Sequence, residues 1–187
     1  MPLSTIDANA ALIVIDLQKG VVALPSAHPM DDVVRNAAAL ADAFRSSDLP
    51  VVLVRATGVA PGRTDVSRPA IGERPPDWAD PVEDLAATEQ DIVITKERWG
   101  AFHDTQLDAE LRRRGVSQVV LAGVATSIGV ESTARAAHEH GYHVVLATDA
   151  MTDRDLDAHD NSVQRIFPRL GETATSEEIL AALRVRR

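Results

Sequence analysis

The segment SQVVLAGVATSIGVESTARAA (117–137) passes from a continuous apolar run into a stretch with helical spacing. A continuous apolar run is typical of a strand in a parallel sheet, which is buried on both faces. We expect a strand at 117–124 and a helix from about Ser127 to His140, which Gly141 ends. A buried strand that turns directly into a helix predicts an α/β fold, and the turn between the two is a usual place for a ligand.

The same alternation recurs along the chain. Further strands are expected at 11–16 (ALIVID), 51–56 (VVLVRA), 91–96 (DIVITK), 142–148 (YHVVLAT) and 171–175 (GETAT). Further helices are expected at 31–47, at 104–114, at 155–170 with a disturbed end at Pro168, and after an N-cap at Ser176. Right-handed crossovers place helices on both faces, so the pattern predicts a three-layer α/β/α, Rossmann-like fold with a six-stranded parallel sheet. We expect a single domain over residues 1–187.

Composition excludes several classes of function. The formal net charge of −9 argues against nucleic acid or an anionic membrane as a partner. Aromatic residues make up only 3% of the chain, so stacking platforms for single-stranded bases are not expected. The absence of cysteine excludes disulfides, thiolate catalysis and cysteine-ligated zinc. The N-terminal segment has no basic region and only a short apolar run, so we expect a cytoplasmic protein.

Ligands of open parallel sheets bind beyond the carboxyl ends of the strands, a rule that selects Asp16, Ala56, Lys96, Val124 and Asp149. Within this group, Asp16 and Lys96 form a pair of opposite charge. Burial would raise the pKa of the Asp16 carboxyl and a nearby ammonium would lower it, so Asp16 is a candidate general acid or base. The alternative is that Asp16 caps the following turn and that Lys96 is a solvated charge at a strand end.

At the end of the fourth strand, Thr126 and Ser127 can cap the helix, which would leave backbone N–H groups of its first turn free to bind an anion. This makes the turn a candidate substrate-binding element, with Val124, Ala125, Thr126 and Ile128 as its residues. Gly129 costs the helix roughly 1 kcal/mol relative to alanine. It indicates either a need for space at this position or a tolerated glycine.

Residues 57–81 (TGVAPGRTDVSRPAIGERPPDWADP) have no regular period and are rich in glycine, proline and charge. Such a long irregular stretch is typical of a functional loop or lid. Its Arg63, Arg68 and Arg74 are candidates to bind a substrate carboxylate, with solubility of the loop as the alternative. Three aromatic residues are candidates for an apolar wall of the site, with core packing as the alternative: Trp78, Trp99 and Phe102.

The histidines and a late acidic segment do not indicate a metal site. His138, His140 and His143 straddle a helix end and a strand start, so they would not share one face. DRDLDAHD (153–160) has a metal-like composition, but its spacing favours a charged helix surface in contact with solvent. We therefore expect neither a structural nor a catalytic metal, and no cofactor.

Four segments together resemble the isochorismatase-like hydrolases, also called cysteine hydrolases. They are ALIVIDLQKG (11–20), DIVITKERWGAFHDTQL (91–107), VVLAGVATSIGVESTARAA (119–137) and VVLATDAMTD (144–153), in the order in which the family carries them. The resemblance implies a strand order of 3-2-1-4-5-6, a small-molecule substrate, and a homodimer or homotetramer. It also implies a cis peptide bond between Val124 and Ala125.

In amidase members of this family, an aspartate, a lysine and a cysteine form the catalytic triad. By resemblance the first two correspond to Asp16 and Lys96, and the position of the cysteine is occupied by Gly129. A covalent thioester mechanism is therefore not available to this chain. Neither Ser127 nor Thr133 occupies the matching position, and the metal motif of the nicotinamidases is missing.

True isochorismatases resemble this chain in carrying glycine at that position. They hydrolyse a vinyl ether and release pyruvate, which requires a proton donor; the resemblance gives this role to Asp16, with Lys96 and a loop arginine holding the substrate carboxylates. However, Ala125, Thr126 and Ser127 are closer to the Ala-Thr-Asn of the amidase branch than to the Tyr-Ala-His of isochorismatases. The alternatives are an amidase inactivated by replacement of its cysteine with glycine, and a non-catalytic metabolite-binding protein.

Overall fold

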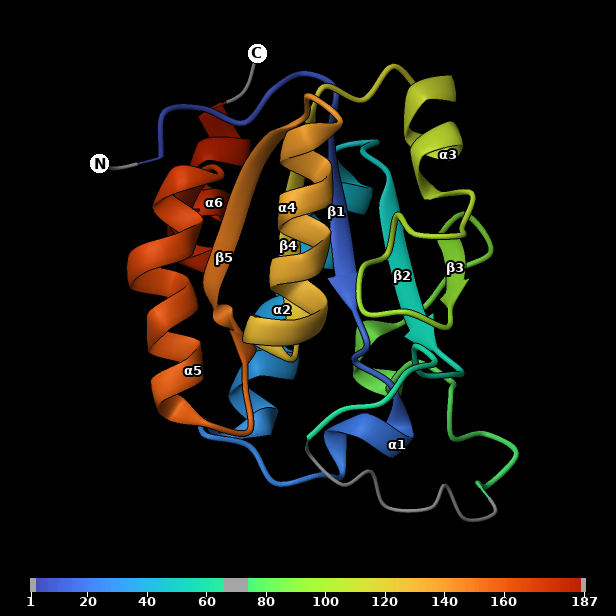
Figure 1. Ribbon diagram of the computed structural model, residues 1–187. Coiled ribbons are helices and arrows are strands. Elements are labelled where there is room, and N and C mark those ends of the chain that lie inside the picture. Colours follow the sequence, from blue (N-terminus) through green and yellow to red (C-terminus); the bar gives the residue numbers. More distant parts are fainter. Residues whose placement is uncertain (1–2, 66–73, 186–187) are drawn as a thin grey trace.

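The computed structural model describes residues 3–65 and 74–185, and within them the chain forms a six-stranded parallel sheet. The strand order is β3-β2-β1-β4-β5-β6, so the predicted α/β architecture and its strand order are confirmed. Figure 1 shows the strands running in one direction, with their carboxyl ends at the end of the molecule that carries α1. The strands are β1 Ala10–Ile15, β2 Val51–Ala56, β3 Ile92–Lys96, β4 Gln118–Val124, β5 His143–Thr152 and β6 Glu172–Ala174.

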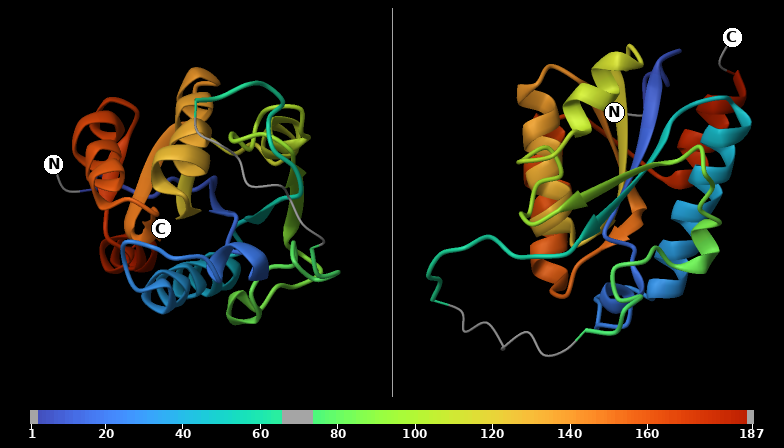
Figure 2. Two further views of the ribbon diagram at one scale, coloured as in Figure 1. Left: turned by 60° about the horizontal axis from the view of Figure 1, so that its bottom comes forward. Right: turned by 90° about the vertical axis from the view of Figure 1, so that its right-hand side faces the viewer.

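Helices cover both faces of the sheet. Figures 1 and 2 show α2 and α6 on one face and α3, α4 and α5 on the other, as crossover connections between parallel strands require. The α-helices are α1 Lys19–Val22, α2 Met30–Ser46, α3 Leu107–Arg113, α4 Glu131–Glu139, α5 Leu156–Asn161 and α6 Ser176–Val185. Two π-helical turns, η2 Thr126–Val130 and η3 Ser162–Ile166, and two 3₁₀ turns, η1 Glu83–Leu85 and η4 Phe167–Arg169, complete the described elements.

The core consists of two apolar layers separated by the sheet. Alternate residues of β1 point to opposite faces, so Leu12 and Val14 pack toward α2 while Ile13 and Ile15 pack toward α4. Every residue of β1 is buried, which explains its continuous apolar run. Each fully buried Leu or Ile side chain contributes roughly 1.5–3 kcal/mol of transfer free energy, so this strand anchors the carboxyl end where Asp16 follows.

The expected end of the fifth strand is wrong because β5 is irregular. The strand does not end at Thr148 but continues to Thr152, and its register with β4 shifts between Leu146 and Met151. Asp149 therefore lies inside the strand rather than at its end. Its carboxylate accepts hydrogen bonds from the backbone N–H and the hydroxyl of Ser176, at 2.6 and 2.7 Å. Asp149 thus holds the start of α6 and is not a ligand-facing residue of the carboxyl edge.

The C-terminal helices also differ from expectation. The predicted helix at 155–170 is divided into α5, η3 and η4, with Pro168 inside the 3₁₀ turn. The N-cap of α6 is Thr175, not Ser176. Thr175 Oγ1 accepts from the Glu178 N–H at 3.2 Å, and the Glu178 carboxylate accepts from the Thr175 N–H at 2.7 Å. This reciprocal capping box leaves the Ser176 hydroxyl free to bond Asp149.

None of the described helices is long and apolar enough to cross a membrane.

The helix predicted at 31–47 is confirmed within one residue as α2, whereas the helix predicted at 104–114 begins only at Leu107. These differences leave the arrangement of the carboxyl edge unchanged, because the strands that carry it have the predicted order.

Candidate active site

Asp16 and Lys96 come together at the carboxyl edge although β3 and β1 are separated by β2. Asp16 follows β1 in a left-handed conformation, φ 53°, with its N–H bonded to the Val54 carbonyl at 2.9 Å. Lys96 is the last residue of β3, and its Nζ donates to Asp16 Oδ2 at 2.7 Å and to the Arg98 carbonyl at 3.1 Å. The alternative of a solvated lysine is wrong, since the Lys96 side chain is only 2% exposed.

The Asp16 carboxyl is poised to exchange a proton. Burial raises its pKa from the ordinary 3.8 to about 6, although the charge and the hydrogen bond of Lys96 act in the opposite direction. Its second oxygen, Oδ1, is buried and has no hydrogen-bond partner among the described residues. A carboxyl with a pKa near 6 populates both protonation states near neutral pH, as general acid–base catalysis requires.

Gly129 lies directly beside this pair. A Cβ atom added to Gly129 would lie 3.4 Å from Asp16 Oδ2, 3.2 Å from Ile15 Cγ2 and 3.1 Å from the Val124 carbonyl oxygen. Any side chain at position 129 would therefore begin against the Asp16 carboxylate. Because position 129 is glycine, no side chain stands between the turn and the Asp16 carboxyl, in a space that a single methyl group would already fill.

The turn before α4 has close backbone packing. A Cβ at Gly123, φ 114°, would lie 2.0 Å from the Ile15 carbonyl oxygen, so only glycine allows β4 to lie this close to β1 here. The peptide bond between Val124 and Ala125 is cis, in agreement with the family resemblance. The Ala125 carbonyl accepts from the N–H groups of Ile128 and Val130, both at 3.1 Å. The backbone of β4 thus brings the turn against the end of β1.

The prediction that Thr126 and Ser127 cap the following helix is wrong. Thr126 Oγ1 lies 2.9 Å from His159 Nδ1, in the buried interior. The N–H and the hydroxyl of Ser127 both donate to Asp153 Oδ2, at 2.7 and 2.8 Å. Both side chains therefore point away from the helix axis toward α5, because polar partners from a distant segment are available there.

Asp153 and His159, which hold the turn, were not predicted from the sequence, and the interpretation of 153–160 as a solvated helix surface is wrong for both. Asp153 is 5% exposed and His159 is 6% exposed. The carboxyl-end rule would have selected Asp153 if the end of β5 had been placed at Thr152. No sequence signal separates His159 from an ordinary surface histidine.

Gln18 was also missed. The residue is 1% exposed, and its side-chain amide bonds both backbone groups of Ala56: Nε2 donates to the carbonyl at 3.0 Å and Oε1 accepts from the N–H at 2.7 Å. Nε2 also lies 3.4 Å from the Trp78 carbonyl. This side chain joins the ends of β1 and β2 to the returning part of the long loop.

Of the loop arginines that the structure describes, Arg74 is engaged away from Asp16. Arg74 donates to the Thr57 carbonyl at 2.9 Å and stacks over the Trp78 ring at 3.9 Å, so it closes the base of the loop. Trp78 in turn packs on Gly20, where a Cβ would lie 1.9 Å from the ring nitrogen. Arg63 is exposed on the segment 57–65, which extends past the carboxyl edge of the sheet (Figures 1 and 2). Arg68 lies outside the described residues.

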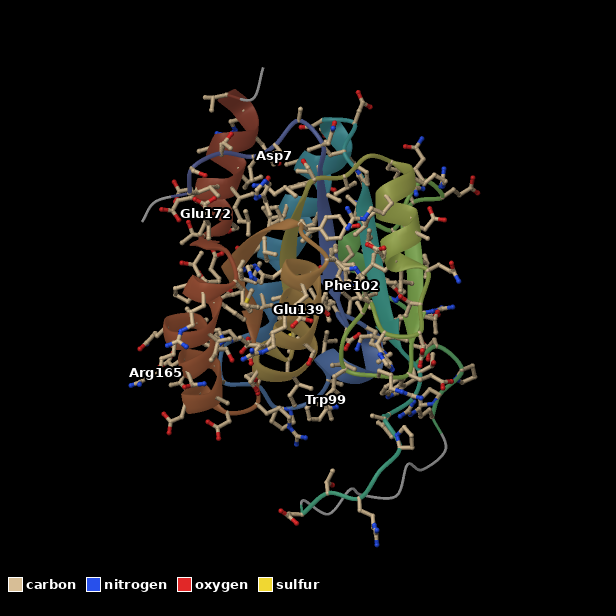
Figure 3. All side chains as sticks on the ribbon, turned by 45° about the horizontal axis from the view of Figure 1, so that its top comes forward. Asp7, Trp99, Phe102, Glu139, Arg165 and Glu172 are labelled. Carbon is tan, nitrogen blue, oxygen red and sulfur yellow. The ribbon has the colours of Figure 1, made fainter. Side chains whose placement is uncertain are left out.

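The remaining predicted residues divide between the two ends of α4. Ile128, 37% exposed, lies beside Gly129 at the beginning of the helix, and Trp99, 53% exposed, lies toward the same end of the molecule (Figure 3). Phe102 lies apart from them. Its ring packs against His140 and Tyr142 at the C-terminal end of α4, with centroids 5.1 and 5.9 Å away. Core packing explains Phe102 better than contact with a substrate.

Val124 and Ala125 line a small pocket of about 70 Å³ on the α2 side of the turn, together with Leu24, Met30 and Thr152.

Within residues 3–65 and 74–185, no group of three His, Asp or Glu side chains is placed to hold a metal ion. The chemistry that the described residues themselves offer is proton transfer at Asp16.

Comparison with known proteins places this geometry in a family. Residues 10–178 match the isochorismatase domain family. The chain belongs to the isochorismatase family. It is 43% identical over 182 residues to the isochorismatase family protein YecD of Escherichia coli O157:H7, covering 94% of this chain and 96% of that protein. An isochorismatase family protein from Burkholderia thailandensis has a solved structure that matches with a TM-score of 0.92 and 42% identity, covering 98% of this chain and 99% of the other.

A third isochorismatase-family relative carries an activity in its name. The secreted isochorismatase effector of Verticillium dahliae is 30% identical over 141 residues, covering 74% of this chain and 69% of that protein. At the level that these comparisons establish, the chain is an isochorismatase-family hydrolase. Its site must be assigned from its own residues, because the family contains both isochorismatases and amidohydrolases.

Proposed function

We propose that this protein hydrolyses a small carboxylated metabolite with an isochorismate-type vinyl ether, using Asp16 as the proton donor and no covalent nucleophile. The observation that carries the proposal is the Asp16 carboxyl itself: it is buried, its pKa is raised to about 6, one of its oxygens has no partner among the described residues, and the adjacent position 129 carries no side chain. The named isochorismatase activity of a relative supports the same substrate class.

The reaction needs one proton donor and one water molecule. Neutral Asp16 protonates the terminal carbon of the vinyl ether, which leaves an oxocarbenium ion at the ether carbon. A water molecule adds to that carbon, and the Asp16 carboxylate takes up one proton from this water molecule. The resulting hemiketal then breaks to pyruvate and an alcohol. Because hydrolysis changes no net oxidation state, the reaction requires no redox partner.

Lys96 has a binding role in this proposal. An ammonium has three N–H donors, and the contacts to Asp16 and the Arg98 carbonyl use two of them. No contact within residues 3–65 and 74–185 uses the third, which would bind a substrate carboxylate next to the acid. Ala125 and Ile128 would border the substrate at the turn, Trp99 would border it from the β3–α3 connection, and Arg63 and Arg68 would approach from the long loop.

The described hydroxyl groups near the turn do not offer an alternative nucleophile. Ser127 donates to Asp153, on the far side of the turn from Asp16. Thr133 donates to the Gly129 carbonyl at 2.7 Å and accepts from the Ala101 N–H at 3.0 Å. Both hydroxyl groups are engaged in structural hydrogen bonds, which supports hydrolysis by direct attack of water.

The test is pyruvate release from isochorismate in a coupled assay, with the parent protein and Asp16→Asn measured in parallel. Release by the parent that collapses in Asp16→Asn supports the proposal. Equal release by both proteins contradicts the role of Asp16. No release by a folded parent contradicts the substrate assignment.

The amidase alternative is favoured by one specific observation. A Cβ atom at position 129 would lie 3.4 Å from Asp16 Oδ2, the oxygen that Lys96 bonds, so a cysteine there would be next to this pair. Gly129→Cys tests it on small carboxylated amides, with Gly129→Ser as the matched control of similar size. Ammonia release by Gly129→Cys alone would assign the fold to an amidase silenced by its glycine. Substrate binding without turnover by any of these proteins would assign it to a non-catalytic binding protein.

A further inference from the structure

The outer side of the Gly129 turn is held by polar side chains of a distant segment. Thr126, which directly follows the cis peptide, is fully buried and lies 2.9 Å from His159 Nδ1. Ser127 is bonded twice to Asp153. The turn therefore faces Asp16 on its inner side and is fixed by two ionisable residues on its outer side.

His159 is part of a pair of histidines. Its ring lies 4.6 Å from the ring of His28, centroid to centroid, and His28 Nδ1 lies 2.9 Å from Thr152 Oγ1. A cavity of about 460 Å³ borders both rings, between α2, β5 and α5. Each Nδ1 is engaged with a threonine hydroxyl, and the cavity gives water and protons a route to the pair.

The surroundings of His159 favour its neutral form. Burial lowers its pKa below the ordinary 6.5, and the neighbouring His28 acts in the same direction. Asp160 and Asp153 act in the opposite direction with smaller effect. The titratable groups that face the pair, in addition to the two histidines, come from α2, β5 and α5 and from the end of β5: Asp32, Asp149, Asp153 and Asp160.

We propose that His159 is the positioning residue of the Gly129 turn: neutral His159 holds Thr126 and thereby keeps the turn against Asp16, and protonation of His159 displaces the turn. A neutral imidazole protonated on Nε2 accepts the Thr126 hydroxyl proton on Nδ1. A second proton converts Nδ1 into a donor, so the buried hydroxyl must rotate and lose this acceptor. The proposal rests on the proposed function insofar as the turn borders the reacting centre.

The first test needs no substrate, so its outcome is independent of the proposed function. The backbone amide resonance of Gly129 is followed against pH by NMR in Asp16→Asn, which removes the titration of the adjacent carboxyl. The ring resonances of His159 are followed in the same samples. We expect the Gly129 amide to shift with the midpoint of His159. A Gly129 amide that is insensitive to the titration of His159 would overturn the proposal.

Two substitutions separate positioning from general stability. His159→Asn places a non-titrating amide near the position of Nδ1, so the Gly129 amide should keep its position while its pH dependence disappears. Thr126→Val removes the hydroxyl at nearly constant volume and should uncouple Gly129 from His159 while both residues remain folded. Retained coupling in Thr126→Val would show that the signal does not pass through this hydrogen bond, which contradicts the proposal.

If the protein is active on isochorismate, a kinetic experiment extends the test. Loss of rate at acid pH should follow the midpoint of His159 in the parent and should be absent in His159→Asn. At neutral pH, His159→Leu should lower kcat about fivefold with a smaller change in KM, the effect of one lost buried hydrogen bond. An unchanged acid limb in His159→Asn would overturn the kinetic role of His159.

Discussion

Among the described residues, two ion pairs with buried carboxylates have opposite properties. Arg45 of α2 donates from Nε and Nη2 to the two carboxylate oxygens of Asp91, at 3.0 and 2.8 Å, and Nη2 also bonds the Leu85 carbonyl. Asp91 additionally accepts from the Thr88 N–H at 2.8 Å. The Asp16 carboxylate has one hydrogen bond, from Lys96, and a buried oxygen without a partner among the described residues.

The difference indicates what each pair is for. A bidentate arginine–carboxylate pair with further backbone bonds compensates for the desolvation of its charges and fixes one geometry. The Asp16–Lys96 pair leaves part of that cost uncompensated, and its carboxyl responds with a raised pKa. The first pair joins α2 to the segment before β3, whereas the second retains a carboxyl with one oxygen that no described residue bonds.

The largest effect is expected from Asp16→Asn on the reaction. General acid catalysis contributes ~10²–10⁴-fold in rate, so removing the proton donor should lower kcat by about a thousandfold. The coupled pyruvate assay measures this, and Arg45→Met serves as the control that disrupts the other pair. A larger loss of kcat in Arg45→Met than in Asp16→Asn, with both proteins folded, would reverse the comparison.

Arg45→Met should have the larger effect on stability. It leaves the Asp91 carboxylate, 2% exposed, without its cation, and breaking a buried pair in this way costs ~3–5 kcal/mol. Because the Arg45 side chain is 18% exposed, we expect about 3 kcal/mol in the free energy of unfolding. Urea denaturation followed by circular dichroism measures it. A loss below about 1 kcal/mol would class this pair with exposed ion pairs.

The pH dependence of stability should sharpen the contrast further. Because the pKa of Asp16 is raised from 3.8 to about 6, the folded protein binds this proton more tightly than the unfolded chain. The stabilisation is complete below about pH 4 and is lost as the pH rises to about 6. Relative to Asp16→Asn, the parent should lose ~2–3 kcal/mol over this window. Parallel curves of unfolding free energy against pH for the two proteins would contradict the raised pKa.

The smallest effect is expected from Gly129→Ala. The added methyl would lie 3.1–3.4 Å from its neighbours, so they need to move by only a few tenths of an ångström. Alanine also gains roughly 1 kcal/mol in helix propensity, so the unfolding free energy should change by less than about 1 kcal/mol. The methyl occupies the approach to Asp16, and we expect kcat/KM to fall about tenfold, ~1.4 kcal/mol in transition-state binding. Unchanged kcat/KM would mean that the substrate does not use this volume.

Elements with local signals were predicted well. The apolar run of β1 and the helical spacing of α2 agree with the structure within one residue at each end. The end of β5 was misplaced because its irregular register with β4 depends on a neighbouring strand and has no local signal. That single error hid Asp153, which lies just beyond the true end of the strand.

The sequence by itself determined that Asp16 and Lys96 lie on one edge of the sheet, because carboxyl ends of parallel strands share one edge and both residues close apolar runs; their contact was decided by the tertiary structure. It also determined that no thiol could act here. Only the tertiary structure decided that Thr126 turns toward His159, 33 positions away, and that Phe102 packs at the far end of α4. The direction of a polar or aromatic side chain depends on which partners other segments bring within reach, and those partners exist only once the chain has folded.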